Sequence, residues 1–293
     1  MYLINLMRRK ISKWVAESFS GSMIERLSND AMSLEWKIIK EFKRFGTVDL
    51  RGKKFWIDYE DSAVSKHIWR CAIWEKETTL FLEKNIRRGQ KVVDIGAHIG
   101  YYTVLFSDLV GNEGHVYAFE PDPINFKLLR RNAEPSNTTI ENKAVSNVDG
   151  YAELFLNSEG NKGDHRIFPV VGRKSIKIKT IKIDTYFADN YVDFIKCDTQ
   201  GAEPLVLKGA EQTLKRCKPV VIIECCPLWK QAKQGIEKSF DPLLDAGYSL
   251  YEIKRTGKLT LKKPNELFKM INENKSELNE ENLLCLSDYQ IKK

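Results

Sequence analysis

The chain has 293 residues, of which 42% are hydrophobic and 30% are charged, and its formal net charge is +7. This length accommodates one large α/β domain with a modest appendage and a sizeable core. The charge is spread along the chain, so it gives no indication of nucleic-acid binding, and no nucleic-acid partner is expected. The six cysteines form no C-x-x-C pair and lack a histidine at zinc spacing, which favours reduced thiols in the core.

No apolar stretch reaches the roughly 20 residues that a membrane-spanning helix needs. The start of the sequence also lacks the apolar core and cleavage site of a signal peptide. A cytoplasmic location is therefore expected.

Residues 1–50 are predicted to form a helical amino-terminal extension, and residues 51–293 the main domain. Within the extension, residues 1–19 are basic and amphipathic, with Arg8, Arg9, Lys10 and Lys13 among apolar side chains. Such a stretch can lie on an anionic membrane surface as a peripheral contact, or it can pack on the body of the protein or on a second copy in a homodimer. Packing is the preferred interpretation.

After the extension, residues 54–59 are predicted to form a strand and residues 63–84 a helix. Strands and helices then alternate, which is typical of a three-layer α/β sandwich with a Rossmann-like, mostly parallel sheet. Two β segments, 151–156 and 175–183, flank a polar loop at 157–172 and indicate a β insertion. Seven strands are predicted for the sheet, at 92–94, 115–119, 138–145, 194–197, 220–223, 248–253 and 283–287, with helices at 101–109, 123–132, 203–215 and 229–245.

The most informative stretch runs from Lys91 to Glu120 and reads as strand, glycine turn, helix, strand and acid. Asp94 closes the first strand, and Gly96 and Gly100 allow a tight turn that a ligand can approach. Glu120 follows the second strand at the spacing where nucleotide-binding α/β units place an acid on ribose hydroxyls. The pattern predicts an adenosine-containing ligand.

The glycine turn differs from the dinucleotide fingerprint G-x-G-x-x-G. His98 stands in place of its second glycine and Tyr101 in place of its third. A pyrophosphate would meet a side chain at its point of closest approach, with the charge of Asp94 nearby. S-adenosylmethionine has no phosphate, and an acidic loop favours its sulfonium and ammonium groups. The turn therefore favours methyl transfer over hydride transfer.

Four motifs in order, DIGAHIGYYT at 94–103, FEPDP at 119–123, DFIKCDTQGAEPLVLKGA at 193–210 and VVIIE at 220–224, resemble the FkbM family of S-adenosylmethionine-dependent methyltransferases. The resemblance covers roughly residues 55–255 and implies the class I methyltransferase fold. Two positions depart from the family pattern. His98 stands where asparagine is usual, and Gln200 stands where D-x-E-G-A-E has an acid, which removes a charge beside the expected site.

The resemblance implies that the loop after the first strand holds the methionine part of the cofactor, with Asp94 near its ammonium. Glu120 would bind the two ribose hydroxyls, and Asn142 is the candidate for a contact around adenine. Tyr102 is expected to pack on the cofactor. The full set of predicted cofactor-binding residues is Asp94, Gly96, Ala97, His98, Gly100, Tyr102, Glu120, Pro121, Asn142 and Asp198.

A hydroxyl acceptor also needs a destination for its proton. The strand-end acid Asp198, the helix-start acid Glu203 and the loop residue His165 are the predicted catalytic residues, and Glu224 is a further candidate. The loop at 161–168, NKGDHRIF, is a natural place to bind substrate. No metal is expected, because clustered carboxylates are not evident in the sequence.

The leading hypothesis is O-methylation of a hydroxyl on a sugar, glycolipid or secondary metabolite, so that the partner is a small-molecule or glycan acceptor. A nitrogen acceptor is the nearest alternative. A cofactor-binding protein without turnover is a second alternative, which the Gln200 departure keeps open. An NAD-dependent oxidoreductase ranks last.

Overall fold

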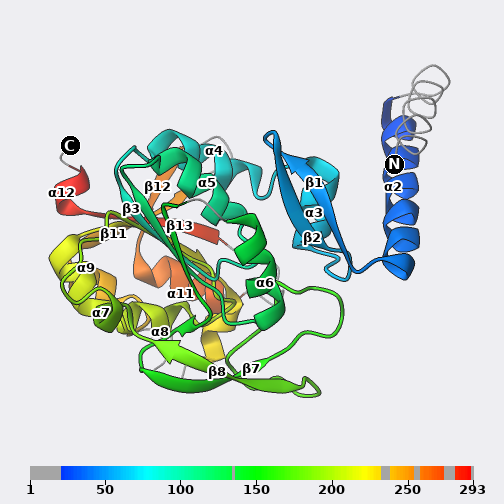
Figure 1. The fold of residues 1–293 in the computed structure, drawn as a ribbon. Coiled ribbons are helices and arrows are strands. Elements are labelled where there is room, and N and C mark those ends of the chain that lie inside the picture. Colours follow the sequence, from blue (N-terminus) through cyan, green and yellow to red (C-terminus); the bar gives the residue numbers. More distant parts are fainter. Residues whose placement is uncertain (1–20, 134–135, 232–237, 254–257, 274–280, 292–293) are drawn as a thin grey trace.

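The computed structural model describes residues 21–133, 136–231, 238–253, 258–273 and 281–291. Helices surround a central sheet, and a smaller β unit and an amino-terminal helix lie at its periphery (Figure 1). The predicted basic stretch at 1–19 lies outside the described residues, so its packing and membrane contact stay predictions. Within the described part of the chain, no helix combines the length and apolarity required to cross a membrane.

The helical elements are α2 (Gly21–Phe42), α3 (Val64–Cys71), α4 (Lys76–Asn85), α5 (Tyr101–Val110), α6 (Pro123–Asn132), α7 (Ile183–Tyr186), α8 (Glu203–Lys208), α9 (Glu211–Cys217), the 3-10 helix η1 (Pro227–Gln231), α10 (Asp241–Leu244), α11 (Pro264–Glu273) and α12 (Asp288–Ile291). The strands are β1 (Phe45–Leu50), β2 (Lys53–Asp58), β3 (Lys91–Ile95), β4 (His115–Phe119), β5 (Thr138–Glu141), β6 (Ala144–Val145), β7 (Gly150–Phe155), β8 (Ser175–Ile181), β9 (Phe194–Cys197), β10 (Val220–Cys225), β11 (Tyr248–Ile253), β12 (Leu259–Lys262) and β13 (Glu281–Ser287).

The central sheet has eight strands in the order β12-β11-β13-β10-β9-β3-β4-β5. The five strands from β10 to β5 are parallel, whereas β13 runs antiparallel to both β10 and β11. All seven predicted sheet strands are present, and β12 adds an eighth at the edge. The strand order reverses between β9 and β3, and in open α/β sheets ligands bind beyond the carboxyl ends of the strands at such a point.

Alternate residues of each central strand face opposite layers. On β3, Val92 packs in one apolar cluster, with side chains of α4, α5 and α6, and Val93 packs in the other, with side chains of α7, α8 and α11. Strands buried on both faces read as continuous apolar runs, which is why Val92, Val93 and the run at 220–223 indicated parallel strands. The three-layer α/β sandwich predicted from the sequence is confirmed.

The predicted β insertion is also present. β7 and β8 pair antiparallel, and β6 joins them to form a separate three-stranded sheet (Figure 1). The third predicted strand, 138–145, is in fact two: β5 stays in the central sheet and β6 leaves for the insertion. Because β5 and β6 are consecutive, the insertion that carries the loop between β7 and β8 is attached directly to the central sheet.

The amino-terminal region differs from the prediction in one respect. α2 is helical as expected, but residues 45–50 form β1, which pairs with β2 in a hairpin. Trp36 of α2 is buried, with its ring 4.9 Å from that of Tyr59, so α2 packs on the segment after the hairpin. The opposite side of α2 leaves Leu34, Ile38 and Phe42 exposed.

Three predicted helices are divided in the structure. The predicted helix at 203–215 forms α8 and α9, with residues 209–210 between them. The stretch 63–84 is divided into α3 and α4 by a turn, in which Ala72 and Glu75 adopt positive φ angles of 54° and 38°. The predicted helix at 229–245 contains η1 and α10, and residues 232–237 between them lie outside the described part. The break between α3 and α4 places Glu75 directly before the first residue of α4.

Candidate active site

A cavity of about 230 Å³ opens at the carboxyl ends of β3, β4, β9 and β10. Its lining includes the turn at 96–98 after β3, the segment 119–121 at the end of β4, and the segment 198–200 after β9. Glu224 near the end of β10 also lines it. The cavity therefore lies at the switch point of the sheet, where the sequence placed the ligand.

The turn after β3 is shaped by Gly96 and His98. Gly96 has a φ of +80°, and a β carbon built on it would lie 1.8 Å from the carbonyl oxygen of Asp198. His98 has a φ of 50°, in the left-handed region that non-glycine residues rarely adopt. Gly96, Ala97 and His98 line the cavity. Gly100 instead begins α5, where a β carbon would lie 2.7 Å from Cδ1 of Leu129, so its role is packing.

Glu120 lies at the end of β4, is 5% exposed and lines the cavity. Its carboxylate accepts a hydrogen bond from the backbone N–H of His98 at 2.8 Å and another from that of Asp122 at 2.9 Å. Burial raises the pKa of Glu120 to about 8, although these N–H donors partly offset the effect. The carboxylate is thus held in place between the turn and the start of α6.

Asn142 does not have the predicted position in the cavity. Its side-chain amide donates to the carbonyl oxygens of Glu120 at 2.8 Å and of Pro121 at 3.1 Å. The next residues, 143–145, line the cavity instead, as does Pro121. Asn142 therefore positions the segment that follows β4 rather than facing a ligand, because its donors are used by the backbone.

Asp94 is 1% exposed and lies beneath the turn, outside the cavity lining. Thr103 donates a hydrogen bond to its Oδ2 at 2.6 Å, whereas Oδ1 is buried without a partner among the described residues. Burial raises the pKa of Asp94, and the nearby Lys196 partly counters this. An unsatisfied buried carboxylate oxygen of this kind favours a cationic or N–H donor at the turn.

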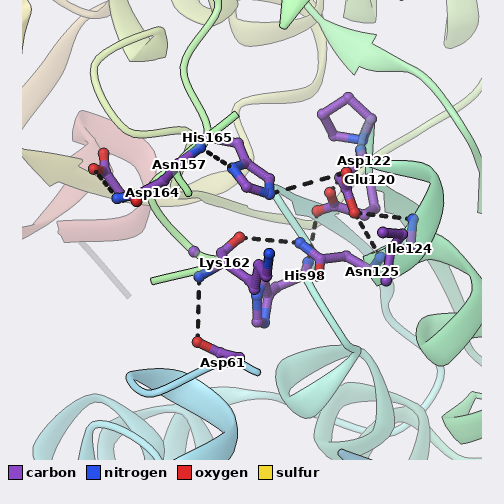
Figure 2. Close-up of polar contacts among 12 residues, drawn as sticks. Asp61, His98, Glu120, Asp122, Ile124, Asn125, Asn157, Lys162, Asp164 and His165 are labelled. Carbon is purple, nitrogen blue, oxygen red and sulfur yellow. Dashed lines mark hydrogen bonds and ion pairs between the residues drawn. The ribbon is translucent and has the colours of Figure 1, made fainter. Parts of the chain in front are cut away.

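The loop at 157–167 covers the Glu120 end of the cavity (Figure 2). The carbonyl oxygen of Lys162 accepts a hydrogen bond from Asn125 of α6 at 3.1 Å, and the Lys162 N–H donates to Asp61 at 3.3 Å. His165 points toward Asp122, with Nε2 and Oδ2 3.9 Å apart. The predicted substrate loop does line the cavity, at the end where Glu120 lies.

The environment of His165 argues against its predicted role as a base. Its Nδ1 accepts a hydrogen bond from the backbone N–H of Asn157 at 3.0 Å, so the proton of the neutral ring is on Nε2. Burial lowers the pKa of His165 to about 4, and the attraction of Asp122 offsets only part of this. A neutral ring whose only lone pair already accepts a hydrogen bond is a poor proton acceptor.

A second group of polar residues lies at the opposite end of the cavity, over β9, β10 and β13. Lys196, the penultimate residue of β9, is 2% exposed. Its Nζ lies 3.0 Å from Oδ2 of Asp198 and 4.5 Å from the ring centre of Tyr102. Burial alone would lower the pKa of Lys196, but the carboxylates of Asp198, Glu75 and Asp94 raise it overall. The lysine therefore stays charged inside the protein.

Glu75 joins the same group from the start of α4. Its Oε2 accepts hydrogen bonds from Oη of Tyr102 at 2.9 Å and from Nδ2 of Asn282 at 3.3 Å. Burial raises the pKa of Glu75, while the charge of Lys196 acts in the opposite direction. Tyr102, predicted to pack on the cofactor, lines the cavity and also fixes this carboxylate.

Gln200 has a clear structural role in this group. Its Nε2 lies 3.3 Å from Oδ1 of Asp198 and 3.1 Å from Oε2 of Glu224, and it donates to both carboxylates. Gln200 itself has a φ of 54°. Thus three non-glycine residues with positive φ, Glu75, His98 and Gln200, line one cavity. Such backbone strain is concentrated at functional sites.

Glu203 has a structural position that argues against its predicted catalytic role. It is fully buried outside the cavity lining, and its carboxylate accepts hydrogen bonds from the N–H groups of Thr199 at 2.6 Å, Gly201 at 2.9 Å and the Trp229 indole at 2.9 Å. Burial raises its pKa to about 7. These donors hold the turn after β9 in shape and leave Glu203 no access to a substrate.

Strand-end carboxylates do converge, which the sequence did not reveal. Oxygen atoms of Asp198, Glu203 and Glu224 lie within 4.8 Å of one another. Because Glu203 accepts three N–H bonds and Gln200 donates to the other two acids, donors from the protein already satisfy much of this cluster. The expectation of a metal-free site therefore needs a direct test.

Among the cavity residues that the sequence analysis did not propose for the site are Trp74, Glu75 and Lys196. The first two lie in a stretch that was read as one continuous helix, which hid the turn that brings them to the site. Lys196 was visible inside the motif DFIKCDTQGAE, where a charged residue interrupts an otherwise apolar strand. A buried lysine is retained only when it is paired, and this could have marked it.

The sheet order β5-β4-β3-β9-β10-β13-β11 with β13 antiparallel, together with the glycine turn and Glu120, defines a class I methyltransferase fold. The family model described as "Methyltransferase FkbM domain" matches residues 94–250, more than half of the chain. The chain belongs to this family.

Among curated proteins, the "Probable cobalt-precorrin-6B C(15)-methyltransferase (decarboxylating)" of Saccharolobus solfataricus is 41% identical over 108 residues, 36% of this chain and 51% of that protein. The "Hexuronic acid methyltransferase AglP" of Haloferax volcanii is 25% identical over 164 residues, 54% of this chain and 66% of that protein. The chain thus spans between half and two thirds of these relatives. A crystal structure of the FkbM methyltransferase of Methylobacillus flagellatus matches at 24% identity and a TM-score of 0.34, covering 46% of this chain and 32% of that one.

Proposed function

We propose that this protein transfers a methyl group from S-adenosylmethionine to a hydroxyl group of a sugar or a sugar-containing molecule. The observation that carries the proposal is the position of Glu120. Its buried carboxylate lies at the rim of the cavity, beside the turn at 96–98, with its orientation set by two backbone N–H groups. A carboxylate held in this way suits two neighbouring ribose hydroxyls.

The charge of the site supports a cationic, phosphate-free donor. Near the turn at 96–98, the carboxylates of Asp94 and Asp198 accompany the ammonium of Lys196. The buried Oδ1 of Asp94, unpartnered among the described residues, lies under the turn. The ammonium and sulfonium of S-adenosylmethionine complement this negative balance, whereas a pyrophosphate would be repelled.

In this proposal the turn at 96–98 holds the methionine part, Glu120 the ribose, and the segment 143–145 the adenine. When bound, the cofactor supplies a methyl group activated by its sulfonium. The residues of the chain orient the acceptor and exclude water, with the loop at 157–167 covering one end of the cavity. Orientation of this kind supplies much of the catalysis in a direct displacement.

A sugar acceptor is favoured by the residues at the other end of the cavity. Trp74 and Glu75 line the cavity, and the carboxylate of Glu75 can accept a hydrogen bond from a hydroxyl group. The name of the Haloferax volcanii relative, a hexuronic acid methyltransferase, agrees with a carbohydrate acceptor.

Two measurements test the proposal. In calorimetry, S-adenosylhomocysteine is expected to bind and NADH is expected to give no heat. With isotope-labelled S-adenosylmethionine and a panel of methyl glycosides of a neutral hexose, a hexuronate and an aminohexose, label is expected on a hydroxyl oxygen. Binding of NADH alone would favour the oxidoreductase, label on the amine would favour an N-methyltransferase, and cofactor binding without transfer to any acceptor would favour a protein without turnover.

A further inference from the structure

The cavity has two chemically different ends, and only one of them is accounted for by the cofactor. The end formed by the turn at 96–98 and Glu120 suits an adenosine. The other end lies over β9, β10 and β13, and it brings Glu75 and Lys196 together with Asp198. The acceptor must enter here if the first end holds the cofactor, so this inference rests on the proposed function.

Two of the acids proposed for taking the acceptor proton, Asp198 and Glu203, already have donors on both carboxylate oxygens. Asp198 forms an ion pair with Lys196 at 3.0 Å and receives the amide of Gln200. Glu203 is buried and satisfied by N–H donors. Glu224 accepts the same Gln200 amide at 3.1 Å. A carboxylate whose two oxygens both accept from the protein offers a poorer contact to an acceptor hydroxyl than one with a free oxygen.

Glu75 differs from Asp198 and Glu203 in how its two oxygens are used. Both donors, Tyr102 and Asn282, go to Oε2. Oε1 receives no hydrogen bond from the described residues, and the side chain lines the cavity. One oxygen is therefore fixed and the other is available to a ligand.

The backbone and its neighbours hold Glu75 in this position. Its φ of 38° and ψ of 70° are left-handed, which is a strained conformation for a non-glycine residue. Asn282 pairs with Glu224 in the register of β13 and β10, so its amide comes from the central sheet itself. Tyr102 belongs to the first turn of α5, which begins directly after the cofactor turn. Glu75 thus contacts both the acceptor end and the first turn of the helix that follows the cofactor turn.

We propose that Glu75 is the catalytic base: the acceptor hydroxyl binds at the end of the cavity over β9 and β10, and its proton passes to Oε1 of Glu75. The hydroxyl oxygen forms a bond to the methyl carbon as the carbon–sulfur bond of the donor breaks, and the electron pair of that bond stays on sulfur. The products are a methyl ether, S-adenosylhomocysteine and a protonated Glu75. Tyr102 and Asn282 are positioning residues for the carboxylate.

Burial adds to this geometry, because it raises the pKa of Glu75 above the ordinary range of a glutamate. A base whose pKa lies nearer the working pH is a better proton acceptor than an ordinary carboxylate. The charge of Lys196 opposes this shift. No such balance applies to His165, whose pKa is moved away from neutrality.

The test compares Glu75→Gln with Glu77→Gln, an exposed acid on the same helix, in the full-length protein. S-adenosylhomocysteine affinity is measured by calorimetry, and transfer from labelled S-adenosylmethionine is measured with the methyl glycoside that the unmodified protein accepts. Glu75→Gln is expected to change the affinity by less than about threefold and to slow transfer by about 10²–10⁴-fold. Glu77→Gln is expected to change neither.

A readout that needs no acceptor accompanies these measurements. In infrared difference spectra of the S-adenosylhomocysteine complex, a carboxyl band is expected to disappear as the pH rises above about 4.3, the ordinary pKa of glutamate. The band should be absent in Glu75→Gln and present in Glu77→Gln. Tyr102→Phe removes a donor to the carboxylate, so it is expected to move this titration to higher pH.

Three results would overturn the assignment: a tenfold or greater loss of S-adenosylhomocysteine affinity in Glu75→Gln, which would make Glu75 a cofactor ligand; transfer by that variant at the normal rate; or no Glu75-dependent carboxyl band. If the unmodified protein methylates no glycoside, the sugar proposal fails, and the affinity and the infrared band still decide the role of Glu75.

Discussion

The backbone of Gly96 lies directly against the carbonyl oxygen of Asp198, so that the turn after β3 and the segment after β9 touch without a side chain between them. A β carbon on Gly96 would fall 1.8 Å from that oxygen. Two segments that are about 100 residues apart in the chain therefore form one wall of the cavity, and their separation sets its shape.

Gly96→Ala is expected to destabilise the fold and to abolish binding of S-adenosylhomocysteine, because the added carbon cannot be accommodated. Gly89→Ala is the matched control: Gly89 has the same φ of +80°, with no atom within 4 Å of the built carbon. Because the added carbon at Gly89 meets no atom, this variant measures only the cost of a left-handed backbone, about 1–2 kcal/mol. Urea unfolding and calorimetry should show a larger effect at Gly96, and equal effects would argue against the close contact.

Glu120→Ala is expected to weaken S-adenosylhomocysteine binding by about 1.5–3 kcal/mol, the range for hydrogen bonds to a charged group. Binding should also tighten as the pH rises through about 8, the pKa that burial gives Glu120, because the ionised carboxylate can accept from both ribose hydroxyls. Calorimetry at pH 6.5 and 8.5 checks this. The control is Glu113→Ala, at an exposed acid in the loop before β4, which should leave the affinity unchanged. If Glu120→Ala also left the affinity unchanged, the ribose assignment would be wrong.

His165 is expected to reduce stability as the pH falls. Its pKa of about 4 in the folded state lies below the value of about 6.5 in an unfolded chain, so the unfolded state binds more protons between these pH values. The contribution of the neutral His165 ring to the free energy of unfolding is fully present above about pH 6.5. It falls by on the order of 1–3 kcal/mol as the pH falls toward 4. The measurement is the free energy of unfolding at pH 7 and pH 5. His165→Gln should show a smaller difference, and an equal one would contradict the buried neutral ring.

Lys196→Met is expected to lower the free energy of unfolding by about 3–5 kcal/mol, because it leaves buried carboxylates without their cation. Asp198 loses its ion pair, and the nearby Glu75 and Asp94 lose an attractive charge. Urea unfolding at pH 7 measures the effect. Lys84→Met, at an exposed position of α4, should lie within about 0.5 kcal/mol of the unmodified protein.

Methyl transfer is expected to survive EDTA. Gln200 donates to both Asp198 and Glu224, which satisfies oxygens that a cation would otherwise need to neutralise. Gln200→Glu replaces this donor with a third acceptor and is expected to create measurable Mn²⁺ binding in calorimetry. Complete loss of transfer by the unmodified protein on chelation would contradict the metal-free interpretation.

Much of the fold could be read from local pattern. Val92 and Val93 are both apolar because their side chains pack in the layers on opposite faces of the sheet, and the run at 220–223 has the same cause. The glycine turn could be predicted because the backbone conformation at Gly96 requires glycine. Glu120 could be predicted because it follows the second strand at the spacing typical of nucleotide-binding units. The domain boundary near residue 50 stays a prediction.

The roles of single polar residues could not be read in the same way. Glu203 and Asn142 have residue types suited to a site, but hydrogen bonds to the local backbone use them for structure. His165 is neutral because of burial, which depends on how the insertion folds over α6. The Trp229 donor to Glu203 and the carbonyl oxygens that Asn142 binds both lie at least 20 residues away in sequence.

The sequence by itself determined the layered sheet, the cofactor turn and the acid that follows β4, because each depends on strand periodicity and on backbone conformation over a few residues. Only the tertiary structure decided which acids face the cavity. Glu75, Lys196 and Asn282 come from a turn, a central strand and a late antiparallel strand, and their hydrogen bonds and charges act across space. The burial and the charge of these side chains depend on which segments pack together, and short stretches of sequence do not determine that packing.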